Sequence, residues 1–248
     1  MVGLTISILT IFPEMVEIVK KYGVLSKAIN EGKIEIKVFN LRDFTNDKHK
    51  TVDDYPFGGG PGMVMKPEPF LNFFDFYKKN FDQPFVILTS PQGQTLNNNL
   101  VKELSLKENL LIICGRYEGI DERIMNFVDM EVSIGDYVLT GGELPAMVIT
   151  DAVSRFVPGV IEEESAKNDS FNNDLLDFPH YTRPREINGL KVPEVLLSGN
   201  HEKIEIWRRK MALKKTMEKR PDLFLKKELD MIDKKALLEL FKELNNNA

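Results

Sequence analysis

Apolar runs rich in β-branched residues alternate with amphipathic segments along roughly the first 160 residues of the chain. The apolar runs predict β-strands at Leu4–Ile11, Ile34–Phe39, Phe85–Thr89, Leu110–Cys114 and Val128–Val132. The segments with helical spacing predict helices at Met15–Lys20, Glu68–Lys79, Leu96–Leu104, Asp121–Asn126 and Glu143–Phe156. Strands and helices that alternate at this spacing predict an α/β fold, with a parallel sheet covered by helices on both faces.

Beyond residue 161 the pattern changes. Between Glu162 and Asp177 stand six acidic residues and only three large apolar ones, a composition that buries little surface and predicts a linker. Farther on, Asn200 is expected to cap a helix that runs to about Lys219, and leucines at helical spacing predict another helix over Lys234–Leu244. We therefore expect a first domain over residues 1–161, an interdomain linker over 162–177 and a small all-α domain over 178–248.

Composition is typical of a soluble globular protein from a reducing compartment. With 248 residues, 42% of them hydrophobic, the chain can bury a full core. The single cysteine, Cys114, lies in an apolar run, which predicts a buried strand thiol and excludes an intramolecular disulfide. Residues 1–12 are apolar but lack a basic region and a cleavage site, and no uncharged stretch approaches the ~20 residues that span a bilayer. We expect a cytoplasmic protein with no membrane partner.

Charge is unevenly distributed along the chain, so the net charge of -5 is misleading. Between Lys203 and Lys227 stand ten lysines and arginines against three acidic residues, a local net charge of +7. A basic segment on an acidic protein suits a polyanionic partner such as RNA. The alternative is a solvated helix face with no partner.

Three glycine-containing segments follow successive predicted strands: Ser90–Gly93, Gly115–Gly119 and Ser133–Pro145. Ligands of open α/β sheets bind beyond the carboxyl ends of the strands, and glycine lets the backbone approach them closely. None of the segments matches a dinucleotide or nucleoside triphosphate motif, and none contains a lysine to meet phosphate. An uncharged or cationic adenosine ligand fits better, with Glu118 or Asp136 facing its positive charge.

Another glycine cluster, Tyr55–Met63, follows the partly basic segment Arg42–Lys50. Adjacent basic and glycine-rich loops suit the approach of a phosphate backbone. A long surface loop with only a structural role is the alternative.

Ordered motifs extend along nearly the whole chain, at Gly58–Met63, Ser90–Gly93, Cys114–Arg123, Ser133–Pro145, Asp169–Phe171, Pro179–Pro184 and Leu196–His201. Together they resemble the bacterial tRNA (guanine-N1)-methyltransferases, the TrmD family. The resemblance implies the SPOUT fold, whose deep trefoil knot binds S-adenosylmethionine, here over residues 1–161. It also implies that residues 178–248 bind tRNA and that the protein is a homodimer with active sites at the subunit interface.

The resemblance further implies which residues contact the methyl donor. These are Leu88, Ser90, Pro91, Gly115, Tyr117, Ser133, Ile134, Gly135, Asp136, Tyr137, Val138, Leu139, Gly141, Gly142 and Pro145. It also implies a need for Mg²⁺, whose ligands cannot be identified from residue spacing.

Methylation of guanine N1 requires a base, because that nitrogen carries a proton, and a cation near oxygen 6, where negative charge grows. The resemblance assigns Asp169 as the base and Arg155 as the cation, and it places Glu118 against the substrate base or the methionine moiety. Without the resemblance, Asp169 is interpreted as a solvated linker acid and Arg155 as a cation that complements a helix dipole.

We therefore expect methyl transfer to the guanosine at tRNA position 37, 3′ of the anticodon, which supports reading-frame maintenance. A ribose 2′-O-methyltransferase and a non-catalytic RNA-binding module are the alternatives. For His180 and His201, substrate contact and structural hydrogen bonding are equally compatible with the sequence. Trp207, beside two arginines, is compatible with base stacking or with a place in the core.

Overall fold

The computed structural model describes residues 3–162 and 169–246, which belong to two compact units. The first unit comprises residues 1–163 and the second residues 164–248. Within the described residues, no helix is both long and apolar enough to span a membrane.

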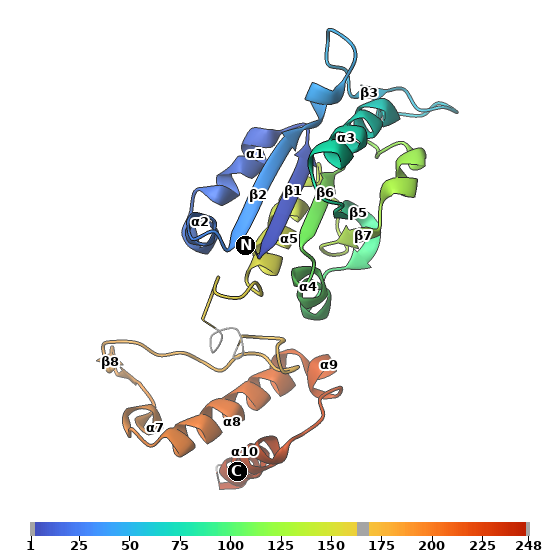
Figure 1. Ribbon diagram of the computed structural model, residues 1–248. Helices are drawn as coiled ribbons and strands as arrows, with labels where there is room; N and C mark the ends of the chain where they lie inside the picture. The colour runs from blue at the N-terminus through green and yellow to red at the C-terminus, as the bar shows by residue number, and fades with distance from the viewer. Residues whose placement is uncertain (1–2, 163–168, 247–248) are drawn as a thin grey trace. The chain divides into compact units, whose positions relative to one another are not determined.

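A five-stranded parallel sheet forms the centre of the first unit (Figure 1). Its strands are β1 (Leu4–Thr10), β2 (Ile34–Asn40), β5 (Phe85–Thr95), β6 (Asn109–Cys114) and β7 (Met130–Ser133), and their order is β2-β1-β6-β5-β7. The predicted parallel sheet is therefore confirmed. Because all strands run the same way, their carboxyl ends lie at one edge of the sheet.

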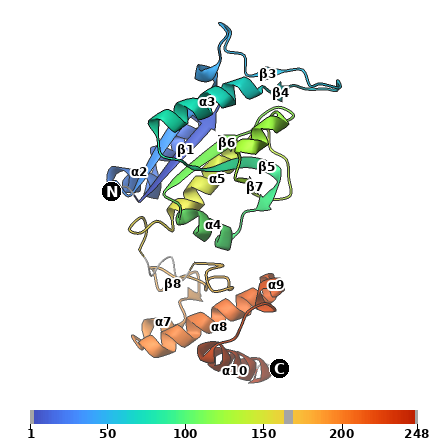
Figure 2. The same ribbon diagram turned by 45° about the vertical axis from the view of Figure 1, so that its right-hand side comes forward.

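Helices cover both faces of this sheet, as the sequence predicts (Figure 2). One face is covered by α1 (Pro13–Glu17), α2 (Gly23–Asn30), α4 (Asn98–Ser105) and α5 (Glu143–Ser154). The other face is covered mainly by α3 (Pro67–Asn80), with the 3₁₀ helices η2 (Leu41–Phe44) and η3 (Glu122–Phe127) beside it.

Side chains that alternate along β1 separate the two cores. Leu4, Ile6 and Ile8 are fully buried on the α5 side, whereas Leu9 is buried on the α3 side. Near-continuous burial of a strand on both faces is typical of a parallel sheet between two helical layers.

Several elements of the first unit differ from the prediction. Strand β5 continues past Thr89 through a register shift, so that Gln94 and Thr95 also pair with β7. Segment 121–126 is a 3₁₀ helix rather than an α-helix. Helix α2 follows the 3₁₀ turn η1 (Ile18–Lys20) and was not predicted, nor was the short pair of strands β3 (Asp53–Asp54) and β4 (Val64–Met65).

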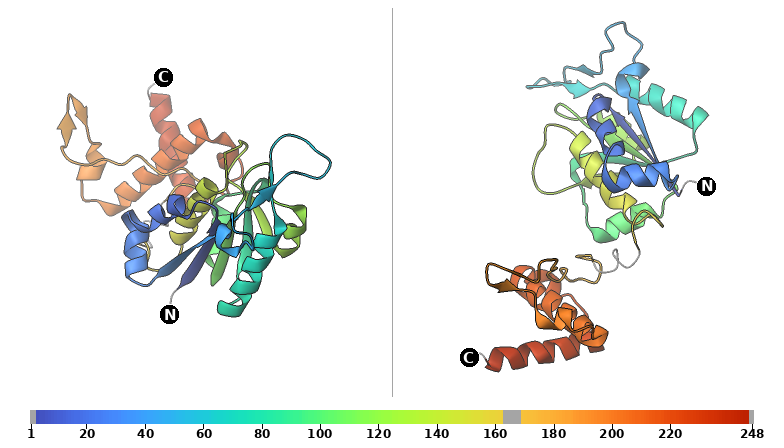
Figure 3. Two further views of the ribbon diagram at one scale, coloured as in Figure 1. Left: turned by 90° about the horizontal axis from the view of Figure 1, so that it is seen from above. Right: turned by 90° about the vertical axis from the view of Figure 1, so that its left-hand side faces the viewer.

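The second unit is mainly helical (Figure 3). It contains α7 (Glu194–Leu197), α8 (His201–Lys219), α9 (Pro221–Phe224) and α10 (Met231–Asn246), together with a hairpin of β8 (Glu186–Ile187) and β9 (Leu190–Lys191). Asn200 caps α8, as predicted, because its side chain accepts a hydrogen bond from the amide of Lys203 at 3.0 Å.

The core of this unit lies between α8 and α10 and includes Leu213, Leu237 and Leu240. Leu175 is also buried in it, although it stands in the segment predicted as a linker. The acidic composition of the segment does not predict this contact, because a single apolar side chain is enough to pack a short turn against a helix.

Candidate functional site

Strand β5 at Thr89 and the loops that follow β6 and β7 meet where helix α5 begins. The segment Ser90–Gly93, predicted as a loop after a strand, lies within β5 at its register shift. The amide of Gly142 donates a hydrogen bond to the carbonyl of Gly115 at 2.8 Å. A Cβ on Gly142 would lie 2.0 Å from Thr89 Oγ1 and 2.8 Å from Cys114 Cα, so only glycine fits there without displacing its neighbours. The chain leaving β7 is therefore packed tightly against Thr89 of β5 and the end of β6.

Glu143 holds this junction together from inside the protein. Its side chain is fully buried and accepts hydrogen bonds from Thr10 Oγ1 at 2.7 Å and from Arg116 Nε at 2.9 Å. Arg116 also donates to the carbonyl of Thr140 at 3.0 Å. Neither Thr10 nor Glu143 was predicted as a site residue, although a carboxylate between a glycine pair and an apolar helix is unusual enough to be noticed.

The loop between β7 and α5 offers both backbone and polar groups to a ligand. Gly135 has φ of +147°, and its amide and carbonyl both bond to the hydroxyl of the buried Ser133. The side chains of Asp136 and Tyr137 are exposed, and the tyrosine hydroxyl donates to the carbonyl of Ile134 at 3.4 Å. These contacts lie within the loop itself, and Thr140 and Gly142 connect it to the loop after β6.

The loop after β6 is paired with the glycine-rich segment 58–63. The amide of Glu118 donates to the carbonyl of Met63, and the amide of Met65 donates to the carbonyl of Gly119, both at 2.9 Å. The Glu118 side chain lies over Gly62, where a Cβ would approach its carboxylate to 2.3 Å. Glu118 is therefore held at the border between the strand-end loops and this segment.

Tyr117 stands at the same border with an unusual backbone and an altered acidity. Its φ is +59°, in the left-handed region that non-glycine residues rarely adopt. Burial raises the pKa of its phenol, and the carboxylate of Asp53 raises that pKa further, while Arg42 opposes the rise. The phenol therefore keeps its proton and can donate a hydrogen bond.

Cys114 is the buried strand thiol that its apolar surroundings predict. Burial raises the pKa of this thiol well above its usual value, and Glu143 adds to the effect. A thiol held in its protonated form is a poor nucleophile, so Cys114 has a packing role.

Arg155 does not lie with these loops in the same chain. It is exposed and caps the carboxyl end of α5, whereas Gly142 caps the amino end. Twelve helical residues separate the two caps, and a helix of that length is about 18 Å long. One copy of the chain therefore does not bring its own Arg155 to its own strand-end loops.

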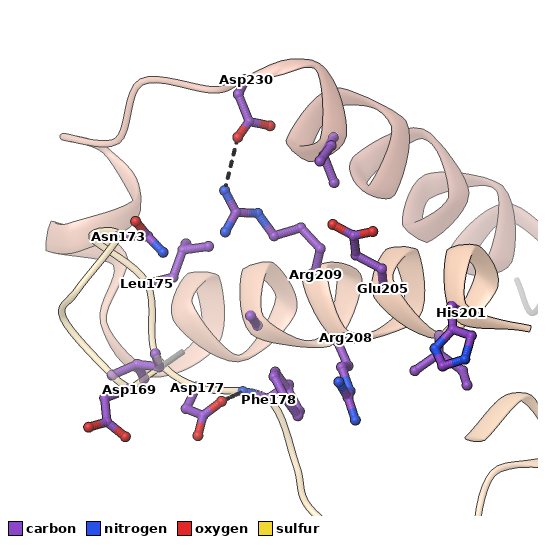
Figure 4. A pocket seen from close by; sticks show the side chains of 14 residues that line it. Asp169, Asn173, Leu175, Asp177, Phe178, His201, Glu205, Arg208, Arg209 and Asp230 are labelled. Carbon is purple, nitrogen blue, oxygen red and sulfur yellow. Dashed lines mark hydrogen bonds and ion pairs between the residues drawn. The ribbon is translucent and has the colours of Figure 1, made fainter. Parts of the chain in front are cut away.

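Asp169 belongs to the second unit and lines a pocket of about 670 Å³ beside α8. Figure 4 shows its carboxylate at the same end of the pocket as that of Asp177, with Arg208, Glu205 and His201 farther along the helix.

Three of the seven lysines and arginines of α8 have acidic partners within the unit. Arg209 pairs with Asp230 and Asp233, and Lys210 pairs with Glu243. Arg208 differs, because its guanidinium lies over the ring of Phe178 at 4.9 Å and has no acidic partner among the ion pairs found in the described residues. The charge available for an external partner is thus smaller than the sequence suggests, and Arg208 is part of it.

The two histidines and the tryptophan lie on the same unit in different settings. His180 bonds to the carboxylate of Asp177 at 2.7 Å and packs against Phe178. His201 is exposed and lines the pocket of Figure 4. Trp207 is half-buried, with its ring 6.3 Å from that of Tyr181. Across residues 3–162 and 169–246, no three His, Cys, Asp or Glu side chains form a cluster suited to a metal ion.

Strand order and the junction at α5 define an α/β protein, and the carboxyl ends of its strands are the candidate ligand site. Comparison with known proteins identifies the family within this class. The family model "tRNA (Guanine-1)-methyltransferase TrmD" matches residues 4–226. The chain belongs to this family. Membership supports the SPOUT fold and the trefoil knot that the sequence motifs imply.

Individual relatives agree with the family match. The chain is 76% identical over 243 residues to the tRNA (guanine-N(1)-)-methyltransferase of Thermosipho africanus, covering 98% of this chain and 99% of the relative. It is 64% identical over 239 residues to that of Thermotoga maritima, covering 96% and 98% of the two chains. The crystal structure of tRNA (m1G37) methyltransferase from Aquifex aeolicus matches with a TM-score of 0.73 and 47% identity, covering 90% and 95%.

Proposed function

We propose that this protein transfers a methyl group from S-adenosylmethionine to N1 of the guanosine at tRNA position 37. The junction of the loops after β6 and β7 with Thr89 of β5 at the start of α5, in a chain that belongs to the tRNA (guanine-1)-methyltransferase family, carries this proposal. Ribose 2′-O-methylation and RNA binding without turnover are the outcomes against which it is tested.

The residues at the junction fit the methyl donor. The loops provide glycine backbone at Gly135 and Gly141 for close approach. They contain no lysine, and the charge of their arginine, Arg116, is balanced by Glu143. Exposed carboxylates at Asp136 and Glu118 can face its positive charge. The remaining donor contacts come from the residues that the family resemblance implies, from Leu88 to Pro145. When bound, the donor supplies an electrophilic methyl group.

The protein's own part in the reaction is to move a proton and to stabilise charge. The Asp169 carboxylate takes the proton from guanine N1, whose electron pair then forms the bond to the methyl group as the carbon–sulfur bond breaks. The guanidinium of Arg155 donates hydrogen bonds to oxygen 6 while negative charge gathers there. Glu118 positions the substrate base beside the donor.

Two copies of the chain are needed to complete this site. Arg155 and the donor loops lie at opposite ends of α5 in one chain, about 18 Å apart by the helical rise. The side chains of Leu144 and Val148 are exposed on α5, as are those of Phe12 and Met15 on the neighbouring α1 segment. An exposed apolar face of this kind is typical of a protein interface, so we assign it to a homodimer with active sites between subunits.

The helical unit is assigned to tRNA, and residues 1–161 to donor binding and catalysis. Arg208, stacked on Phe178, offers a guanidinium to a phosphate or a base. His180, His201 and Trp207 belong to the same unit and are further candidates for contact with tRNA.

Transfer of a labelled methyl group to tRNA transcripts tests the proposal. A transcript with guanine at position 37 is expected to be labelled and one with adenine there is not; equal labelling of both would contradict the assignment. Label on ribose oxygen, or tight binding of tRNA with no turnover, would select one of the alternatives. The same assay with and without Mg²⁺ tests the metal requirement.

Asp169→Asn separates the chemical step from binding. Because the amide cannot take the N1 proton, this variant is expected to bind donor and tRNA like the unaltered protein but to lose at least a hundredfold in rate, roughly the contribution of general base catalysis. An active Asp169→Asn variant would show that another group is the base.

A further inference from the structure

The turn that carries Asp169 is closed by hydrogen bonds between its two halves. The amide of Phe171 donates to the carbonyl of Leu175 at 2.8 Å. The amide of Asp177 donates to the hydroxyl of Ser170 at 3.0 Å. The first half of the turn, with Asp169, is therefore fixed to the second half.

The second half of this turn is itself hydrogen-bonded to helix α8. The hydroxyl of Thr216 accepts a hydrogen bond from the amide of Leu176 at 2.8 Å and donates one to the carbonyl of Ala212 at 2.7 Å. Thr216 is fully buried, so water does not compete for these bonds. The preceding residue of α8, Lys215, donates a hydrogen bond from its Nζ to the carbonyl of Asp177 at 3.0 Å.

We propose that Thr216 is a positioning residue for methyl transfer, because its hydroxyl fixes the turn from which Asp169 reaches the substrate. The inference rests on the proposed function, in which Asp169 is the base. In this inference the position of Asp169 is set by hydrogen bonds within the helical unit, whereas its proposed role is in the active site. The binding of tRNA by α8 and the placement of the Asp169 carboxylate then depend on the same structural unit. Lys215 is a second residue of α8 that holds this turn in place.

Hydrogen exchange at a single amide reports directly on this support. Thr216→Val keeps the shape of the side chain but removes the oxygen that accepts from Leu176, whereas Thr216→Ser keeps that oxygen. We expect faster exchange of the Leu176 amide in Thr216→Val and protected exchange in Thr216→Ser. Unchanged protection in the valine variant would overturn the proposal without any reference to activity.

Single-turnover rates then connect the support to the reaction. With saturating donor and tRNA, Thr216→Val is expected to transfer methyl roughly 10- to 100-fold more slowly, as expected when a reacting group is misplaced by about an ångström. The dissociation constant for the donor should stay unchanged, and Thr216→Ser should restore the rate. A full rate in Thr216→Val, or an equal loss in both variants, would refute the positioning role.

Lys215→Met provides a second variant that leaves the buried core of the unit intact. It removes the bond to the Asp177 carbonyl and is expected to lower the single-turnover rate in the same direction as Thr216→Val. An unchanged rate in Lys215→Met and Thr216→Val, together with an inactive Asp169→Asn, would overturn this inference alone. An active Asp169→Asn would instead overturn the base assignment in the proposed function.

Discussion

At the scale of single residues, Gly142 is a position in the strand-end loops that tolerates no added atom. Its missing side chain leaves room for Thr89 Oγ1 and for the backbone of Cys114, which a Cβ would approach to 2.0 and 2.8 Å. We expect Gly142→Ala to lower the free energy of unfolding by about 1–3 kcal/mol, since backbone must move to relieve the overlap.

Urea unfolding of Gly142→Ala beside Gly115→Ala checks this expectation. Gly115 lies in the same junction, but the nearest atom to a Cβ there is 3.7 Å away, which is ordinary contact. Gly115→Ala should therefore unfold at nearly the same urea concentration as the unaltered protein. Similar destabilisation by both substitutions would mean that steric overlap at Gly142 is not the cause.

Glu143 is the second residue whose chemistry is fixed by its surroundings. It is fully buried, and its two oxygens accept from Thr10 and Arg116, whose side chain is 17% exposed. Glu143→Gln keeps the volume but leaves the Arg116 guanidinium without its anion, so we expect a loss of about 3 kcal/mol in unfolding free energy.

A double-mutant cycle measures this coupling. Glu143→Gln, Arg116→Gln and the double variant are compared by chemical denaturation, and the double variant should lose clearly less than the sum of the two single losses. Strictly additive losses would show that the pair contributes no coupling to the junction.

At the scale of elements, the sequence predicts the bounds of a strand best where a continuous apolar run is the only local signal. The apolar runs at β1 and β6 match the observed strands within one or two residues, because each is buried on both faces. The run at the edge strand β2 matches as closely, with Ile34 and Ile36 buried and its other residues half-buried. Strand β5 is longer than predicted, since the register shift after Thr89 lets polar residues pair with β7. Helix α2 has only eight residues and begins at a glycine, so its amphipathic pattern is too short to identify.

Helix α8 illustrates the limit of counting charges along a sequence. Arg209, Lys210 and Lys214 are paired with acidic side chains of the same unit, whereas Arg208 lies on the ring of Phe178. Acidic partners from α10 are distant in sequence, and the local count of charges therefore overstates the positive surface.

The difference between these cations predicts their roles in tRNA binding. Arg208→Ala is expected to weaken tRNA binding several-fold and to reduce the slope of log affinity against log salt by about 1, the loss of one phosphate contact. Lys214→Ala, on the same helix but paired with Glu218, should change the slope less. Filter binding over a series of salt concentrations measures both, and identical slopes for Arg208→Ala and the unaltered protein would argue against the contact.

At the scale of the whole molecule, the sequence offers candidate residues for the site but does not predict how they come together. Glycines after successive strands predict the donor loops, since parallel strands bring their carboxyl ends to one edge. No local pattern distinguishes Arg155 from an ordinary helix-capping cation, or Asp169 from a solvated acid. Their assignment rests on family resemblance, because in the proposed function their roles depend on a second copy of the chain and on substrate.

Complementation between two inactive variants tests whether the site is shared by two copies. Arg155→Ala keeps the donor loops, whereas Gly135→Val keeps Arg155 but places a side chain at φ of +147°, where a Cβ would lie 2.6 Å from the Tyr137 ring. Each variant alone should be inactive. In a mixed dimer, the loops of one subunit face the intact Arg155 of the other, so one site of two is complete.

Random exchange of subunits in an equal mixture makes half of the dimers mixed, each with one complete site. The mixture is therefore expected to recover about a quarter of the unaltered activity, since closed twofold symmetry allows one good site per mixed dimer. Light scattering of Val148→Glu provides the matching structural measurement, because a charge on the exposed face of α5 should yield monomers. A mixture that stays inactive while mixed dimers are shown to form would place Arg155 and the donor loops of one chain in the same site, against the distance along α5.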